Sequence, residues 1–147
     1  MKTIVALVDF SDVTSLVMEQ ARQMAKAFQA EVIILHWVPG QPVVIDLGVG
    51  SPTVVQSPSE RKIEDHYNQL LDLRDSLAAD GVEVSAHQLE EGSVTAVLAE
   101  SLRRNADLII VGEHHHSALY QLFVGTFTSD VLQRTHCPVL VVPAAAK

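Results

Sequence analysis

The chain has few basic residues. It contains 10 Lys and Arg against 18 Asp and Glu, which gives a formal net charge of -8 at pH 7. A phosphate backbone repels a surface of this charge, and the clustered basic face that nonspecific nucleic-acid binding needs is absent. We therefore expect no nucleic-acid partner.

Cysteine and long hydrophobic runs are also scarce. Cys137 is the only cysteine, so no disulfide can form within the chain, and a single thiol suits a reducing compartment. The segment Met1–Val8 reaches Asp9 before a secretory hydrophobic region can form. The longest later apolar stretch, Pro138–Ala146, is far shorter than the about 20 residues of a membrane-spanning helix. These features predict a cytoplasmic protein that does not enter a membrane.

Apolar residues are plentiful by contrast. They make up 48% of the 147 residues, and charged residues make up 19%, which is enough apolar material for a packed core. No repeat, low-complexity tract or composition shift marks a boundary along the chain. We predict one globular domain over residues 1–147.

Short apolar runs alternate with segments of helical periodicity. The runs are typical of buried strands, and they comprise Ile4–Val8, Val32–Val38, Val82–Leu89, Asp107–Val111 and Pro138–Val142. Between them, apolar residues recur at spacings of three and four, which predicts helices. The candidate N-caps of these helices are Ser11 or Asp12, Ser59 and Ser93, and a further short helix is predicted over Ser129–Gln133.

The alternation itself predicts the fold class. Strands that alternate with helices form right-handed crossovers and a mainly parallel sheet. We therefore predict an α/β fold with a single doubly wound, five-stranded, Rossmann-like sheet and helices on both faces. The segment Pro39–Pro58 is rich in Pro, Gly and Ser and predicts an unusually long loop.

Candidate binding residues follow the predicted strands. Ligands of open α/β sheets bind beyond the carboxyl ends of the strands, where the strand order reverses. The segments at these ends are Val8–Ser11, His36–Val38 and Val111–His116. We expect them to share one edge of a crevice.

Four segments of the chain together resemble the universal stress protein family. They are Val8–Ser11, Leu35–His36, Asp107–Gly112 and Cys137–Val142. In the nucleotide-binding branch of that family, the fourth strand leads into two glycines three residues apart, then nine residues, then Gly followed by Ser or Thr. Gly112, Gly125 and Thr126 match these places. The resemblance covers essentially the whole chain and implies the adenine nucleotide alpha hydrolase-like fold.

One glycine of this pattern is replaced by His115. Such glycines let main-chain N–H groups approach phosphate oxygens without an intervening Cβ atom. A histidine still donates its amide, but it does not adopt every glycine conformation easily. The resemblance therefore leaves two alternatives open. One is a stress sensor or regulator that binds ATP, ADP or AMP, with Mg²⁺ as a candidate counterion. The other is a dimeric interaction module that has lost nucleotide binding.

The resemblance also implies a set of nucleotide-binding positions. The Asp9 carboxylate can accept ribose hydroxyl hydrogens, the main chain at Trp37 would recognise the adenine edge, and Gly125–Thr126 would present N–H groups to an anion before a helix. The full set is Leu7, Asp9, Trp37, Val111, Gly112, His114, His115, Gly125, Thr126 and Phe127. Each also has a structural interpretation: Asp9 caps the first helix, Gly112 eases a strand exit, and Gly125–Thr126 only starts a helix.

Metal binding and catalysis find less support. The three consecutive side chains of His114–His116 point in different directions, so we expect no metal site. The chain has no phosphate-binding loop of the Gly-x-x-x-x-Gly-Lys-Ser/Thr type, no Gly-x-Ser-x-Gly turn, and no lysine between Arg104 and Lys147. We expect that the protein is not an enzyme, or that it hydrolyses ATP slowly at most. An apolar last strand needs covering, and the family commonly pairs subunits there, so the resemblance implies a homodimer through Val139–Val142.

Overall fold

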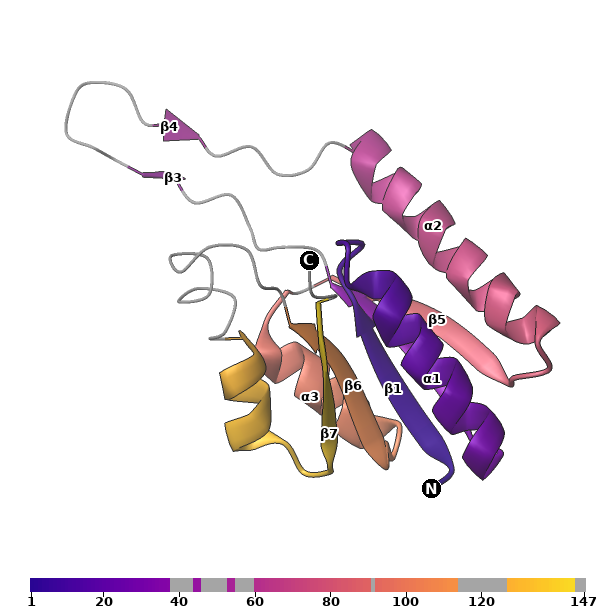
Figure 1. Cartoon of the computed structure of the whole chain (residues 1–147). Helices are drawn as coiled ribbons and strands as arrows, with labels where there is room; N and C mark the ends of the chain where they lie inside the picture. The colour runs from indigo at the N-terminus through magenta and orange to yellow at the C-terminus, as the bar shows by residue number, and fades with distance from the viewer. Residues whose placement is uncertain (38–43, 46–52, 55–59, 91, 114–126, 145–147) are drawn as a thin grey trace.

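One five-stranded sheet organises the molecule (Figure 1). The computed structural model describes residues 1–37, 44–45, 53–54, 60–90, 92–113 and 127–144. The sheet has the order β5-β2-β1-β6-β7, and each neighbouring pair is parallel. Its strands are β1 (Thr3–Val8), β2 (Glu31–Trp37), β5 (Val84–Leu89), β6 (Leu108–Glu113) and β7 (Val139–Pro143). The predicted α/β fold with a parallel sheet is thereby confirmed.

Helices cover both faces of this sheet. On one face lie α1 (Thr14–Phe28) and α2 (Glu60–Ala79), whose apolar side chains share a cluster with Ile4, Ala6 and Val8 of β1. On the other face lie α3 (Val94–Arg103) and a helix over residues 127–134, which pack against Val5 and Leu7. We name these the α1/α2 face and the α3 face. No helix among the described residues is long and apolar enough to cross a membrane.

The predicted helix boundaries hold at some ends and fail at others. Ser93 caps α3 as predicted, because its Oγ accepts a hydrogen bond from the main-chain N–H of Ala96 at 3.1 Å. The predicted cap of α1 at Ser11 or Asp12 is wrong. The N-cap is Val13, which has no side-chain cap, and the N–H of Thr14 instead donates to the main-chain carbonyl of Ser11.

The Pro39–Pro58 segment contains regular structure that the sequence did not reveal. Its described residues form two short strands, β3 (Val44–Ile45) and β4 (Thr53–Val54), which pair antiparallel as a separate sheet. Strands of two residues are too short to show a periodicity of two. The predicted loop is therefore interrupted by a small hairpin-like pairing.

Gly112 lies where α1 packs closely on β6. A Cβ atom built at this position would lie 2.4 Å from Val13 Cγ1 and 3.1 Å from Val17 Cγ2. The φ angle of Gly112 lies outside the left-handed region, so the close helix, and not the backbone conformation, requires a residue without a side chain. Gly112 therefore has a structural role inside β6, where α1 packs against it, and not the predicted role of easing a strand exit.

Replacing Gly112 with alanine should destabilise the protein. The added methyl group must displace Val13, and overpacking of this kind costs about 1–3 kcal/mol of the free energy of unfolding. Urea denaturation of Gly112→Ala measures this loss. The double variant Gly112→Ala/Val13→Ala should lose less unfolding free energy than the sum of the losses in the two single variants, because the smaller side chain at position 13 leaves room for the added methyl group. Full additivity would contradict the steric explanation.

Candidate functional site

The strand order reverses between β1 and β6. The chain passes from β1 to β2 on one side, continues to β5, and then crosses to β6 on the other side of β1. Asp9 follows β1, Trp37 ends β2 and Gly112 lies in β6. Since these strands are adjacent and parallel, the three positions lie together at the carboxyl ends of the strands. Ligands of such folds bind at this end of the sheet.

Asp9 shapes the turn that leaves β1. Its Oδ1 atom accepts hydrogen bonds from the main-chain N–H of Ser11 at 3.0 Å and from Ser11 Oγ at 2.6 Å. A carboxylate bonded to the N–H two residues ahead closes a turn of the Asx type. The Asp9 residue is exposed. Thr14 Oγ1, at the start of α1, also lies 3.5 Å from Asp9 Oδ1. The Asp9 carboxylate is therefore held in this turn, at the surface of the predicted site.

Phe10 adopts an unusual backbone conformation beside this carboxylate. Its φ angle is 59°, in the left-handed region that aromatic residues rarely occupy. Its ring contacts the His36 ring at a centroid distance of 4.6 Å and the His66 ring at 5.2 Å. Strained conformations persist where the surrounding structure holds them, and these ring contacts are the support for Phe10.

His36 is the buried member of this ring cluster. It lies on β2, its side chain is 1% exposed, and its Nδ1 atom is 3.0 Å from the main-chain oxygen of Val8. A carbonyl oxygen only accepts, so Nδ1 carries the proton and Nε2 of the neutral ring is an acceptor. Within the described part of the chain, that Nε2 atom has no hydrogen-bond partner, and neither does Nε2 of Gln88, the register neighbour on β5. Burial is the main cause that lowers the pKa of His36.

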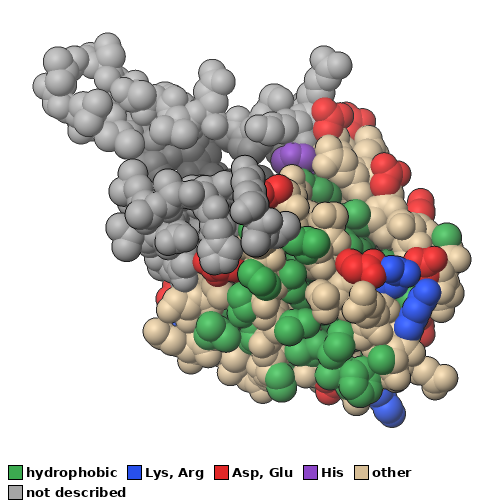
Figure 2. All heavy atoms as spheres, viewed as in Figure 1, with side chains coloured by type: hydrophobic (Ala, Val, Ile, Leu, Met, Phe, Trp, Pro, Cys, Tyr) green, Lys and Arg blue, Asp and Glu red, His purple; other side chains and the backbone are tan. Residues whose placement is uncertain are grey.

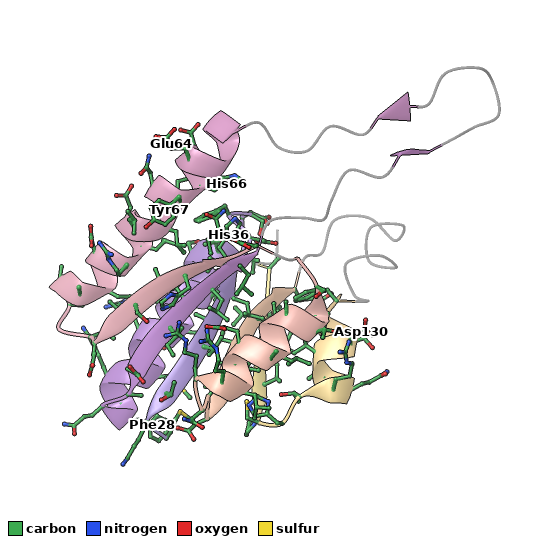
Figure 3. The ribbon with its side chains drawn as sticks, turned by 180° about the vertical axis from the view of Figure 1, so that it is seen from behind. Phe28, His36, Glu64, His66, Tyr67 and Asp130 are labelled. Carbon is green, nitrogen blue, oxygen red and sulfur yellow. The ribbon has the colours of Figure 1, made fainter. Side chains whose placement is uncertain are left out.

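The ring cluster links three elements. His66 belongs to α2, and its ring meets the His36 ring edge-on at a centroid distance of 5.3 Å. Figure 3 shows these two histidines close together at the end of the sheet beside α2. His36 begins the segment His36–Val38 predicted at the crevice edge, but neither His36 nor His66 is among the predicted nucleotide-binding residues. The available signal was a histidine that directly follows the buried apolar run Val32–Leu35.

The apolar members of the predicted site form one group on the α3 face. Leu7 and Val111 are each 2% exposed, and Phe127, the first residue of the helix 127–134, packs against the same cluster. Trp37 is described in its main chain, which is in register with Leu89. The remaining predicted residues, His114, His115, Gly125 and Thr126, lie outside the described residues.

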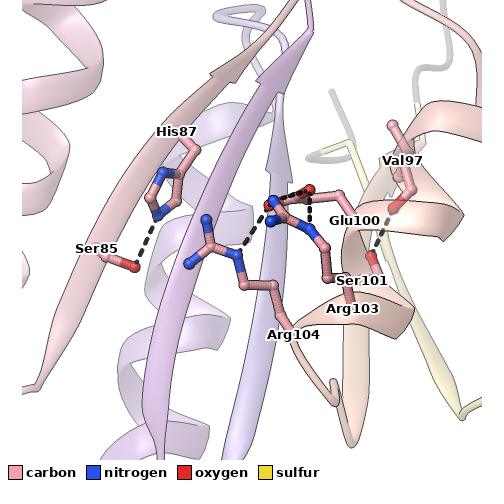
Figure 4. A network of polar contacts seen from close by, with 7 residues as sticks. All are labelled: Ser85, His87, Val97, Glu100, Ser101, Arg103 and Arg104. Atoms are coloured by element: carbon pink, nitrogen blue, oxygen red, sulfur yellow. Dashed lines mark hydrogen bonds and ion pairs between the residues drawn. The ribbon is translucent and has the colours of Figure 1, made fainter.

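A separate polar network occupies the α3 face near β5 (Figure 4). Arg104 Nε donates to Glu100 Oε1 at 2.8 Å, and Arg103 also pairs with Glu100. These contacts, the Arg103 hydrogen bond foremost, lower the pKa of the Glu100 carboxyl. His87 lies 3.3 Å from Ser85 Oγ, and burial, together with Arg104, lowers its pKa. Among the described residues, no group of three or more His, Cys, Asp or Glu side chains is placed to hold a metal ion.

Comparison with known proteins identifies the family. The sequence profile of the Universal stress protein family matches residues 1–143, and the chain belongs to that family. It is 30% identical over 146 residues to Universal stress protein MJ0531 of Methanocaldococcus jannaschii, an alignment that covers 99% of this chain and 84% of the relative.

Solved structures agree in fold. A universal stress protein in complex with cAMP has a TM-score of 0.70 and 21% identity, and the match covers 98% of both chains. The universal stress protein from Archaeoglobus fulgidus in complex with dAMP has a TM-score of 0.67 and 19% identity, with 97% of both chains covered. At 19–21% identity, these matches show that the chain shares the fold of the two structures, that is, the arrangement of the sheet and its helices.

The buried His36 predicts a loss of stability in acid. Its pKa is lower in the folded protein than in the unfolded chain, so unfolding takes up a proton below about pH 6.5. The stabilising effect of a neutral His36 is therefore complete above that pH and is lost as the pH falls towards the folded pKa. The slope for one such group is at most about 1.4 kcal/mol per pH unit.

Urea denaturation across this pH range measures the effect. The difference in unfolding free energy between neutral and acidic buffer should be smaller for His36→Asn than for the parent chain. Replacement of the exposed His136 by glutamine is the control. An unchanged pH dependence in His36→Asn would show that His36 does not cause the acid sensitivity.

Proposed function

We propose that this universal stress protein binds ATP, ADP or AMP at the edge between β1 and β6, and that occupancy of the site regulates its role in a cytoplasmic stress response. The observation that carries the proposal is the exposed Asp9 carboxylate, held by its turn where the strand order reverses. The family members solved with cAMP and dAMP support an adenine nucleotide as the ligand.

Each part of the nucleotide has a proposed partner. Asp9 accepts hydrogen bonds from ribose hydroxyl groups, and the main chain at Trp37 recognises the adenine edge. Leu7, Val111 and Phe127 form an apolar group on the α3 face of the sheet, next to this site. Gly125 and Thr126 directly precede the helix 127–134, where N–H groups and the helix dipole favour an anion.

Phosphate binding here would depend on main-chain groups. The chain carries a net charge of -8 and has no lysine between Arg104 and Lys147. Main-chain N–H groups around Gly112, His114 and His115 are therefore the proposed phosphate ligands. Mg²⁺ prefers oxygen ligands and keeps several waters, so Asp9 and the nucleotide's own phosphates would suit it. We propose no catalytic step, and slow hydrolysis would appear as phosphate release above the buffer rate.

Millimolar ATP should raise the melting temperature of the purified protein. A ligand that binds only the folded state stabilises it by about 2.7 kcal/mol at a concentration 100 times its Kd. We expect Asp9→Ala to reduce this shift, because the variant lacks the carboxylate for the ribose. Asp75→Asn removes the same charge from an exposed position of α2 and should leave the shift unchanged.

A second candidate function is a dimeric stress-response module without a nucleotide. His115 in place of a motif glycine favours it. Absence of both a thermal shift and co-purified nucleotide would reject nucleotide binding in the parent chain. If His115→Gly then gained the shift, the histidine would be identified as the block.

We also propose that residues 1–147 form one domain that pairs as a homodimer through β7. This strand lies at an edge of the sheet. Pro138 O accepts from the N–H of Ile109, and the N–H of Ala144 donates to Glu113 O. In a parallel ladder this alternation directs the N–H groups of Val139 and Val141 away from β6. Figure 2 shows hydrophobic side chains gathered where β7 and α1 lie, and a two-fold pairing would cover them.

Replacing Val141 by proline should separate the proposed dimer. Proline removes an N–H group that points away from β6, so the ladder within the subunit is kept while pairing across the edge is lost. Light scattering should give about twice the 16.0 kDa chain mass for the parent chain and a mass near 16.0 kDa for Val141→Pro. A parent mass near 16.0 kDa would contradict the homodimer.

A further inference from the structure

Both chain neighbours of Asp9 are in contact with one side chain. Val8 precedes Asp9, and its main-chain oxygen lies 3.0 Å from His36 Nδ1. Phe10 follows Asp9, and its ring lies 4.6 Å from the His36 ring. The imidazole of His36 thus holds the chain directly before and directly after the carboxylate.

These two contacts restrict the Asp9 turn. The left-handed φ of Phe10 reverses the chain after Asp9 and brings the N–H of Ser11 to Asp9 Oδ1. The packing of the Phe10 ring, which also contacts the hydrophobic cluster of the α1/α2 face, offsets the strain of this conformation, which costs of the order of 1–3 kcal/mol. His66 completes the packing from α2, since its ring contacts both Phe10 and His36.

We propose that His36 is a positioning residue for the Asp9 turn, because its Nδ1–H binds the Val8 carbonyl. The Phe10 ring is also held by His66 and by the hydrophobic cluster of the α1/α2 face, so the hydrogen bond is the contribution that only His36 makes. The inference rests on the proposed function for its ligand: the nucleotide would bind tightly only when this turn is in place. His36 itself contacts no ligand in this proposal. It acts through the two residues that flank Asp9.

The environment of His36 favours the neutral ring, because burial lowers the pKa of the imidazole more than the Val8 hydrogen bond and Asp9 raise it. Asp9 is the negative group near it and favours protonation, whereas His66 from α2 opposes it. Gln88 from β5 and Phe10 add no charge, and burial opposes protonation most strongly. A proton on Nε2 would add a buried donor without an acceptor among the described residues. We therefore infer that acid loosens the turn and weakens nucleotide binding.

Two substitutions at His36 separate the hydrogen bond from the packing. In His36→Asn, the amide nitrogen takes the place of Nδ1 and keeps the donor to Val8. In His36→Leu, the bulk stays but the donor is lost. His87→Gln is the matched control, because His87 is also a histidine of lowered pKa but lies on the α3 face.

Titration with ATP at neutral pH should give clearly different affinities. We expect His36→Leu to raise the Kd by about 10-fold, the change that corresponds to one lost hydrogen bond of about 1.4 kcal/mol. His36→Asn and His87→Gln should stay within about 3-fold of the parent chain. In acid, the Kd should rise for the parent chain and for His87→Gln but not for His36→Asn. An unchanged Kd in His36→Leu, or equal losses in both His36 variants, would overturn the proposal.

The Ser11 amide provides a readout that needs no nucleotide. Its N–H donates to Asp9 Oδ1, so its amide proton resonance and hydrogen exchange rate report on the turn. We expect faster exchange in His36→Leu and parent-like exchange in His36→Asn. A parent chain that binds no ATP would overturn the proposed function alone, and unaltered Ser11 exchange in His36→Leu would overturn the role of His36.

Discussion

The burial of β1 on both faces is the constraint on which the rest of the structure depends. All six residues of this strand are at most 7% exposed, with β2 and β6 bonded to its two edges. A strand enclosed in this way is expected to be apolar, and β1 is apolar from Ile4 to Val8, while its one polar side chain, Thr3 at the start, donates a hydrogen bond to Glu31. The first polar residue after it, Asp9, therefore emerges where the strand leaves the core. The position of the candidate site is in this sense a consequence of the core.

The short connection from β1 to α1 adds a second constraint. Only five residues separate Val8 from Thr14, so α1 starts directly over the sheet, and Val13 lies against Gly112 of β6. The chain can turn this sharply because Phe10 accepts a left-handed conformation and Asp9 bonds to Ser11. The short connection from β1 to α1 therefore accounts for three chemically different residues. It needs the small Gly112 under the helix, the left-handed Phe10 and the turn closed by Asp9.

The sequence predicts those features that depend on periodicity or on parallel order. The continuous run Ile4–Val8 predicted a buried strand, and parallel order alone placed Asp9, Trp37 and Gly112 at one edge. The α1 cap was predicted wrongly because Ser11 bonds to the Asp9 carboxylate within the turn, and the helix begins after Val13, which has no side-chain cap. His36 was missed because its role depends on Phe10 and His66, which are distant in sequence and meet it only in the fold.

A comparison of two aspartates shows why residue type alone could not define the site. At the amino end of the sheet, Asp107 Oδ2 accepts from the main-chain N–H groups of Lys2 at 2.8 Å and Thr3 at 3.0 Å, and these bonds lower the pKa of its carboxyl. At the carboxyl end, Asp9 Oδ1 accepts from one main-chain N–H, that of Ser11, and from the Ser11 hydroxyl group. Both carboxylates are therefore structural, but only Asp9 lies where the strand order reverses. Its place in the fold, and not its chemistry, is therefore what distinguishes Asp9 as a candidate site residue.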